Sequence, residues 1–474
     1  MDKKPNILFF FTDDQRFDAV SALGNREIQT PNIDKLAERG TVFTHAHIAG
    51  GTAGAICMPS RAMLHTGRTL FHLNGEGQTL SENHALLGET FRQAGYETFG
   101  TGKWHNGTDA FARSFSCGDE IFFGGMNDHW NVPACHYDPA GRYEDRALKI
   151  PDFSFSNREI SCICDHVIPG KHSSELFCDA AVSFLQSHDG RNPFFAYVSF
   201  MAPHDPRSMP EEFRKMYNPA DIKIPQNFMS MHPVEYGNTS IRDELLASYP
   251  RTPEETKKHI AEYYAMISHL DREMGRVLQT LENRGMSENT IILFSSDNGL
   301  ALGQHGLFGK QNHFEHSIRV PFIIAGSGIP AGERNESYFY LFDVFPTLCE
   351  LAGLGTPGTV EGKSFASAVR GGESKTRDNL YFAYKDKIRS VKNRRYKLME
   401  TVHGGKLTSR LYDIAKDPWE LADLSGTGEY RDVAENLRKE LFMYRDEWDD
   451  MMHAQGRDYW ESYAEASKSG RLLP

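Results

Sequence analysis

Cys57 and Arg61 stand one helical turn apart in the sequence. Pro59 favours the first turn of a helix and Gly67 favours a helix end, so we predict a short helix over residues 57–66. The cysteine and the arginine would then share one face. The free N–H groups and the dipole at the start of such a helix favour an anion. The segment therefore predicts an anion site beside a reactive group, whereas a lone cysteine is more often a small buried hydrophobe.

Oxygen-bearing side chains follow two separate apolar runs. Asp13 and Asp14 come directly after the run 6–11, and the pair Asp297 and Asn298 follows another run. Carboxylate and amide oxygens suit a hard divalent cation such as calcium or magnesium, and zinc would be a poor match. Either pair alone could instead cap a following helix. Two such pairs at separate strand ends predict a metal site.

Four short apolar runs are typical of parallel strands that are covered on both faces. They are residues 6–11, 96–99, 194–200 and 290–294. Amphipathic stretches between them predict helices over 32–39, 86–94, 174–187 and 256–283. The alternation predicts an α/β fold with a large, mostly parallel sheet flanked by helices. Ligands bind beyond the carboxyl ends of strands in such sheets, so the polar groups that follow these runs are expected to converge.

Basic residues occupy the same strand ends. Lys103 and His105 follow the run 96–99, and His204 follows the run 194–200. Each of them alone is more often a solvated or structural group. Their place beside the predicted metal site makes them candidates for binding an anionic substrate.

These segments together resemble the type I sulfatases, which belong to the alkaline phosphatase-like superfamily and oxidise a cysteine to formylglycine. The motifs that carry the resemblance are Cys57-Met58-Pro59-Ser60-Arg61 with Thr66-Gly67-Arg68, Gly102-Lys103-Trp104-His105, Pro203-His204 and Gly306-Leu307-Phe308-Gly309-Lys310. His65 departs from the pattern, because the family more often has an apolar residue there. The resemblance implies a calcium ion, with magnesium possible, held by Asp13, Asp14, Cys57, Asp297 and Asn298.

The resemblance also implies a catalytic set and a mechanism. The set is Cys57, Arg61, Lys103, His105, His204 and Lys310. Formylglycine (3-oxoalanine) as its hydrate would offer one hydroxyl to attack sulfur and a second whose deprotonation later expels sulfate. His204, with Lys310, is the candidate for protonating the leaving alcohol, and His105 for assisting the second step. The sequence alone does not order the two histidines.

The substrate is expected to be a sulfate ester on a short saccharide. The pattern resembles bacterial carbohydrate sulfatases that act on fragments of glycosaminoglycans or algal polysaccharides. His129 and Trp130 suit stacking against a sugar, although a core role for Trp130 is equally open. An arylsulfatase, a phosphate or phosphonate monoester hydrolase of the same superfamily, and an inactive saccharide-binding homologue are the alternatives. The expected protein partner is a formylglycine-generating or anaerobic sulfatase-maturing enzyme.

Composition narrows the class of protein. The chain has 474 residues and a net charge of −12, which opposes binding along nucleic acid. Its apolar runs are too short for a membrane span, so no membrane partner is expected. The seven cysteines favour reduced thiols. The N-terminus lacks an apolar signal segment, which predicts a cytoplasmic protein, or a periplasmic one if a signal peptide has been removed.

The chain is expected to divide into a catalytic domain, residues 1–372, and a C-terminal subdomain, residues 373–474. The second part resembles the C-terminal subdomain of sulfatases, with a small antiparallel sheet, one helix over 432–449 and a tail. Its strands are predicted at 380–384, 388–391, 396–399 and 407–412. Residues 106–170 and 206–250 lack periodicity and are predicted to be long loops over the strand ends.

Overall fold

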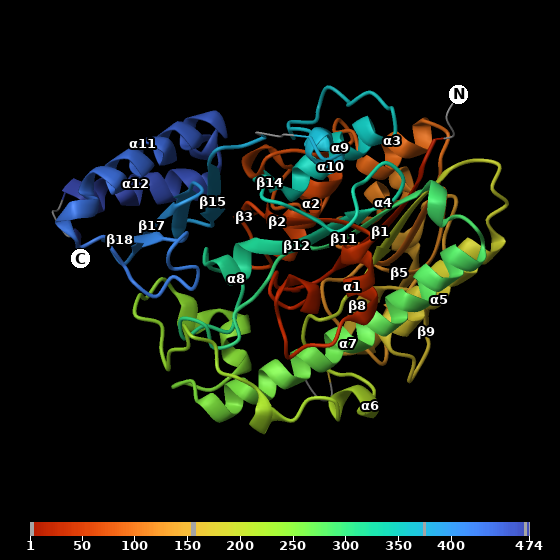
Figure 1. Ribbon diagram of the computed structural model, residues 1–474, viewed down its shortest axis with the longest axis horizontal. Helices are drawn as coiled ribbons and strands as arrows, with labels where there is room; N and C mark the ends of the chain where they lie inside the picture. The colour runs from red at the N-terminus through yellow and green to blue at the C-terminus, as the bar shows by residue number, and fades with distance from the viewer. Residues whose placement is uncertain (1–3, 153–157, 373–375, 469–471, 474) are drawn as a thin grey trace.

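A large mixed sheet forms the centre of the computed structural model, which describes residues 4–152, 158–372, 376–468 and 472–473 (Figure 1). The strand order is β13-β2-β12-β11-β1-β10-β4-β5, and β14 also pairs with β2. Only β12 runs antiparallel to its neighbours among these described strands. The strands are β1 (Asn6–Thr12), β2 (Gly40–His47), β4 (Glu97–Lys103), β5 (Cys117–Phe122), β10 (Phe194–Ser199), β11 (Thr290–Ser296), β12 (Arg319–Ala325), β13 (Glu333–Asn335) and β14 (Phe339–Tyr340).

Helices cover both faces of this sheet, which explains the unbroken apolar runs. Successive side chains of a strand point to opposite faces, and in β1 Phe9 and Phe11 belong to one hydrophobic cluster while Leu8 and Phe10 belong to the other. The first cluster includes α2 (Cys57–Thr66), α3 (Leu87–Gln93) and α9 (Val344–Leu351), and the second includes α1 (Pro31–Glu38), α5 (Ser173–Ser187) and α7 (Pro253–Asn283). The predicted α/β class is therefore confirmed.

A second sheet lies toward the C-terminus, with the order β19-β18-β17-β16-β15-β3. Its central strands are antiparallel, as the sequence predicts: β15 (Leu380–Tyr384), β16 (Ile388–Lys392), β17 (Tyr396–His403) and β18 (Lys406–Asp413). At its edges are β19 (Leu472–Leu473) and β3 (Gly50–Gly51), which comes from the N-terminal part of the chain. Buried side chains of both sheets belong to the same hydrophobic cluster, so the two sheets pack through one continuous core. The boundary predicted after residue 372 adjoins residues 373–375, which lie outside the described residues.

The helix predicted over 432–449 is present, but the tail predicted after it contains a second helix. Two helices pack on the second sheet, α11 (Arg431–Glu447) and α12 (Ala454–Lys468). Tyr459, Trp460 and Tyr463 form the buried face of α12. Three closely spaced aromatic residues supply enough apolar surface to hold this helix, and the sequence interpretation treated them as a tail.

The prediction of a loop over 106–170 is also wrong. The segment contains the sheet strand β5 and several short elements: α4 (Thr108–Ser114), β6 (Pro133–Ala134), a turn of 3-10 helix at Tyr143–Arg146, the β7 (Ala147–Pro151) and β8 (Glu159–Ile163) hairpin, and β9 (His166–Val167). Elements this short carry too few residues to show a period. Residues 153–157 lie outside the described part of the chain.

The other predicted loop, 206–250, contains only short helical turns. They are α6 (Glu211–Arg214) and turns of 3-10 helix at Pro219–Asp221, Asn238–Ser240 and Arg242–Leu246. The remaining short elements are α8 (Glu315–Ile318), α10 (Ala366–Val369) and 3-10 turns at Ser21–Leu23, Leu70–His72, Ser287–Asn289, Leu341–Asp343, Gly428–Tyr430 and Asp450–Met452. Within the described residues, no helix combines the length and the apolar character that a bilayer crossing needs.

Candidate active site

The two central strands of the main sheet bring the four predicted oxygen ligands together. Strands β1 and β11 are parallel, and Thr12 is paired with Ser296, so Asp13 and Asp297 follow side by side. The backbone N–H of Asp297 donates to the Thr12 carbonyl at 3.1 Å. Asp14 has a positive φ of 67°, and its N–H donates to Asp297 Oδ1 at 3.1 Å. A non-glycine residue in this conformation is strained, and such strain is concentrated at functional sites.

The donor atoms at these strand ends fit a hard cation. Asp13 Oδ1 and Asn298 Oδ1 are buried and have no hydrogen-bond partner among the described residues. One donor atom each from Asp13, Cys57 and Asp297 lies within 4.8 Å of the others. Buried oxygens without a partner are costly, and a bound calcium or magnesium ion would satisfy them.

The surroundings of Asp13 and Asp297 shift the pKa values of these two carboxyls in opposite directions. Burial opposes ionisation of Asp13, but the charges of Lys103 and His204 outweigh it and lower the pKa of this carboxyl. Burial and the neighbouring Asp13 raise the pKa of Asp297. Two carboxylates forced this close repel each other, which a divalent cation between them would relieve.

Arg61 lies behind the two carboxylates and is fully buried. Its Nε donates to Asp297 Oδ2 at 2.7 Å, and its Nη1 donates to Ser199 Oγ at 2.6 Å and to the Lys103 carbonyl at 3.1 Å. Its Nη2 lies 4.0 Å from Asp13 Oδ2. Helix α2 therefore holds the guanidinium where it counters the carboxylate charge.

Cys57 begins α2 and lies between two basic residues. Its Sγ is 3.6 Å from Lys103 Nζ and 3.6 Å from His105 Nδ1. Burial raises the pKa of the thiol to about 11, although Lys103 and Lys310 act in the opposite direction. Cysteine nucleophiles need a lowered pKa. The unmodified thiol is therefore poorly suited to attack an ester.

The turn after β4 places Lys103 and His105. Gly102 has a φ of 83°, and a Cβ there would lie 1.7 Å from the Ser199 carbonyl oxygen, so only glycine fits. His105 also has a positive φ, 70°. Burial, together with the charge of Lys103, lowers the pKa of the His105 imidazole well below its usual value. This ring is therefore held in its neutral form.

Lys310 and His204 approach the same region from the other side. Lys310 Nζ lies 2.6 Å from Asp14 Oδ1, and His204 Nε2 lies 3.7 Å from Asp14 Oδ2. His204 Nδ1 donates to the Asp205 carbonyl at 2.8 Å, which fixes the ring and leaves Nε2 for chemistry. Burial opposes the charge on Lys310, but Asp14 raises its pKa and keeps it protonated. The structure thus brings together all the residues that the sequence predicted as metal ligands or catalytic groups.

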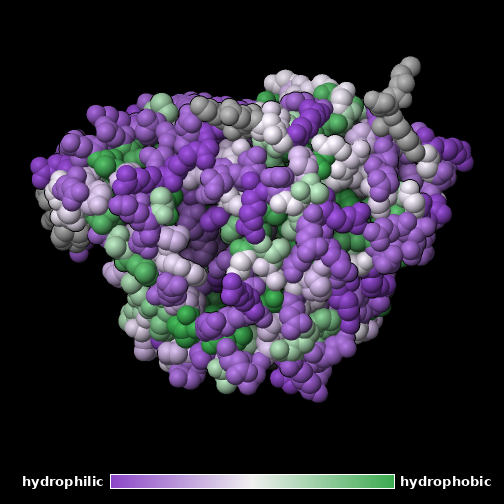
Figure 2. Space-filling view, viewed as in Figure 1, coloured by the Kyte–Doolittle hydropathy of each residue, from purple (hydrophilic) through white to green (hydrophobic). Residues whose placement is uncertain are grey.

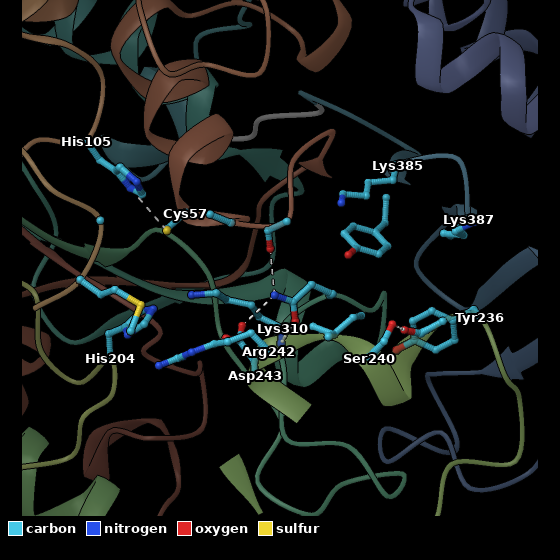
Figure 3. Close-up of a pocket in the computed structure, with 18 of the residues that line it drawn as sticks. Cys57, His105, His204, Tyr236, Ser240, Arg242, Asp243, Lys310, Lys385 and Lys387 are labelled. Carbon is cyan, nitrogen blue, oxygen red and sulfur yellow. Dashed lines mark hydrogen bonds and ion pairs between the residues drawn. The ribbon is translucent and has the colours of Figure 1, made fainter. Parts of the chain in front are cut away.

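A cavity of about 820 Å³ opens over these groups. Cys57, His105, His204 and Lys310 line it, whereas Arg61 and Lys103 lie behind them. Figure 3 shows Cys57 and His105 at one end of the cavity and Tyr236, Lys385 and Lys387 at the other. Further basic side chains also line the cavity, and we call the following set the rim: Tyr236, Arg242, Lys385, Lys387 and His403.

Sequence reasoning missed the rim. Lys385 and Lys387 flank the turn between β15 and β16, in the second sheet, and the only signal was a charged turn between two short strands. Tyr236 and Arg242 lie in the segment predicted to be a loop. Figure 2 shows a largely hydrophilic face of the molecule with a recess between the C-terminal part, on the left, and the main body.

Other histidines and a tryptophan stay outside the cavity. Trp130 packs edge-on against His172, with ring centroids 5.0 Å apart, so the expected stacking against a sugar is not supported. His129 is buried, and its Nε2 donates to the His204 carbonyl at 3.1 Å. His305, which is close to Lys310 in sequence, stacks on Phe314 instead. These side chains are structural.

Comparison with known proteins identifies the family of the chain. The family model described as Sulfatase matches residues 5–354. The chain belongs to the sulfatase family. A second model, described as N-sulphoglucosamine sulphohydrolase, C-terminal, matches residues 303–447. The chain is therefore a sulfuric ester hydrolase of the alkaline phosphatase-like superfamily.

Several relatives cover nearly the whole chain. An arylsulfatase of Clostridium perfringens is 28% identical over 92% of this chain and 94% of its own length. An N-acetylglucosamine-6-O-sulfatase of Bacteroides thetaiotaomicron is 25% identical over 93% of this chain and 86% of its own. A solved structure, in complex with its substrate D-glucosamine-2-N,6-O-disulfate, superposes with a TM-score of 0.75 at 24% identity, covering 96% of this chain and 99% of that one. The similarity to this structure supports the fold.

His65 shows how this sulfatase accommodates a polar residue inside α2. Its ring packs against Trp104, with centroids 4.3 Å apart, and against Tyr197 at 5.0 Å. Burial and the nearby Arg61 lower the pKa of His65 to about 3, so the ring is neutral. A neutral imidazole between two aromatic rings takes the place of an apolar side chain.

Proposed function

We propose that this sulfatase removes sulfate from a short sulfated saccharide, with formylglycine derived from Cys57 as its nucleophile and calcium, or magnesium, at the strand ends. The observation that carries the proposal is the position of Cys57. Its thiol is buried, resists ionisation, and lies between Lys103 and His105 and close to Asp13, whose Oδ1 has no hydrogen-bond partner among the described residues. This environment suits an oxidised residue that no longer depends on a thiolate.

The cation would be held by Asp13, Asp14, Asp297, Asn298 and the modified residue 57. When bound, it would lower the pKa of the nucleophilic hydroxyl and neutralise the sulfate group. The residues around it have separate roles. Lys310, which lines the cavity, holds the charge of the transferring group, and Arg61 and Lys103 reinforce that positive field from behind.

Two histidines divide the proton transfers. His204, held by the Asp205 carbonyl, presents Nε2 to the cavity side and donates a proton to the departing sugar oxygen. His105, a neutral ring beside residue 57, accepts the proton whose removal releases sulfate. Protonation matters here because a sugar alcohol is a poor leaving group.

The dimensions and charge of the cavity support a saccharide. A volume of about 820 Å³ is within the range of pockets that enclose most of a small ligand. Lys385 has a positive φ of 41°, and its ammonium has no hydrogen-bond or ion-pair partner among the described residues. A strained, unpaired cation on the rim suits a second anionic group on the sugar, such as a carboxylate or another sulfate. The named relatives that act on sulfated glucosamine add support.

The burial of Cys57 also constrains its maturation. The residue is 2% exposed, so the maturing enzyme we propose as a partner has to reach residues 57–61 before α2 packs. Addition of that enzyme to the folded, unmodified chain should leave the thiol unchanged.

Peptide mass spectrometry on an active preparation tests the proposal. We expect residue 57 as formylglycine, and Cys57→Ser should lose turnover while it retains saccharide binding. Matched sulfate and phosphate esters of one sugar and one phenol then compare the alternatives. Activity with only the unmodified thiol would overturn the nucleophile, and a preference for the phosphate esters would indicate a monoester hydrolase of the same superfamily.

A further inference from the structure

A group of imidazole and carboxylate side chains lies outside the active site, where β5 meets the β6 and β9 pair. Glu120 is on β5, His136 follows β6, and His166 begins β9. One donor atom from each lies within 4.8 Å of the others. We propose that Glu120, His136 and His166 bind a divalent ion of the zinc type, separate from the catalytic cation. This inference does not depend on the proposed substrate or nucleophile.

The hydrogen bonds behind the two histidines match those of metal-binding imidazoles. His136 Nδ1 bonds Asp119 Oδ1 at 2.9 Å, and His166 Nδ1 bonds Asp165 Oδ1 at 2.5 Å. A metal-binding histidine usually donates its other N–H to such a carboxylate, which fixes the ring and the tautomer. Both rings are therefore arranged with Nε2 as the ligand atom. Asp165 is itself held by Arg146 at 2.5 Å.

Glu120 and the two imidazole rings lie against one another. His166 Nε2 is hydrogen-bonded to Glu120 Oε2 at 2.8 Å, and a bound metal would replace the proton between these two atoms. The His136 and His166 rings are stacked, with centroids 4.2 Å apart and an interplanar angle of 17°. Ligands around a tetrahedral zinc lie about 3.3 Å apart, given zinc–ligand distances of about 2.0–2.1 Å. Small side-chain movements would therefore complete the site.

The donor atoms of this group favour a different metal from those of the active site. Two imidazoles and one carboxylate suit zinc and similar ions, whereas the active-site ligands at the ends of β1 and β11 are oxygens that suit calcium or magnesium. The exposure differs too, because Glu120 is buried, His166 is half-buried and His136 is exposed. The site can thus exchange its metal with solvent and keep water as a fourth ligand.

The proposed metal would close the base of an active-site loop. Glu120 precedes the loop 123–134 and His136 follows it, while Ile121 and Cys135 exchange two backbone hydrogen bonds of 2.9 Å. A metal bound by both flanks would lock the two ends together in the way that a cross-link restricts a loop.

This loop forms part of the cavity wall. Gly125 and Met126 line the cavity, and a Cβ at Gly125 would lie 2.6 Å from His105 Nε2. His129, near the middle of the same loop, donates to the His204 carbonyl. Metal binding would therefore steady the loop that packs against both catalytic histidines.

Cobalt and zinc binding test the proposal without an activity assay. With calcium saturating, we expect the full chain to bind one equivalent of zinc by calorimetry, and cobalt to show the visible bands of a tetrahedral site. His136→Gln should abolish both signals, and it should not unfold the chain because His136 is exposed. Asp119→Asn should weaken zinc binding about 10–100-fold, as expected for a group that positions a ligand.

Two controls separate this site from others. His84→Gln removes a half-buried imidazole elsewhere and should leave zinc binding unchanged. Asp297→Ala, which removes a ligand of the active-site cation, should also leave zinc binding unchanged. Hydrogen exchange of residues 123–134 should slow on zinc addition in the unaltered chain and not in His136→Gln. Zinc binding that is absent, or equal in the unaltered chain and His136→Gln, would overturn the proposal.

Discussion

The floor and the rim of the active-site cavity are built in opposite ways. The floor consists of Asp13, Asp14, Cys57, Asp297 and Asn298, all of which are buried and held by strand ends or the start of α2. The rim comes from turns and from the second sheet, and its Lys385 and Lys387 are half-exposed. Chemistry shared by every substrate needs the rigid, desolvated floor. Recognition of one substrate needs only a few well-placed charges on the rim.

The floor should account for the largest losses. Asp297→Ala, or removal of divalent cations by a chelator, should lower kcat/KM by about 10³-fold on a saccharide sulfate and on nitrophenyl sulfate alike, because both need the cation. Calcium or magnesium should restore the chelated enzyme but not the variant. The exposed Asp189→Ala serves as the control. Normal turnover in a fully demetallated sample would contradict the assignment of the floor.

Replacement of Arg61 should cause the second-largest loss of kcat/KM, equal for the saccharide sulfate and for nitrophenyl sulfate. Arg61→Ala removes a charge behind the floor and should cost about 10²–10³-fold in kcat/KM. It also leaves Asp297 buried without its partner, which costs about 3–5 kcal/mol of stability. Circular dichroism and thermal unfolding should therefore accompany the kinetics, and Arg61→Lys provides a variant that keeps the charge. A loss of kcat/KM confined to the saccharide sulfate would show that Arg61 acts in substrate recognition and not in the chemistry common to both substrates.

His204 connects floor and rim, and its effect should depend on the leaving group. His204→Ala should slow saccharide sulfate hydrolysis about 10²-fold or more and nitrophenyl sulfate hydrolysis far less, because a nitrophenol leaves without a proton. The measurement is the ratio of the two kcat values where chemistry limits the rate. Equal losses would exclude His204 as the acid and leave Lys310 or His105.

The rim should give the smallest and most selective change. Lys385→Gln should raise KM about tenfold, or about 1.4 kcal/mol, for a saccharide with a second anionic group. The same variant should leave kcat, and hydrolysis of a neutral aryl sulfate, almost unchanged. Lys223→Ala, an exposed lysine elsewhere, is the matched control. An equal effect on both substrates would show that the floor and the rim are not separate in function.

The sequence predicted the main-sheet strands β1, β4, β10 and β11 and the helices α1, α3, α5 and α7, but not the other strands of this sheet. Apolar runs such as 290–294 correspond to buried strands, because a strand covered on both faces must be apolar throughout. Strands β5 and β6 were missed, since such short segments lack a period of their own. Helix α12 was missed for a different reason, because its aromatic face makes sense only against the second sheet.

The sequence by itself determined the chemical inventory of the floor. Asp13 and Asp14 end one strand and Asp297 and Asn298 end another, and parallel neighbours place such ends at one edge. Tertiary structure alone decided the rim, because Lys385 reaches the cavity only through the pairing of β15 with β3, just ahead of α2. It also decided the environment of Cys57, since the pKa of its thiol depends on burial and on lysines far away in sequence. Local sequence sets strand and helix ends, whereas burial and long-range charge arise only when the chain is packed.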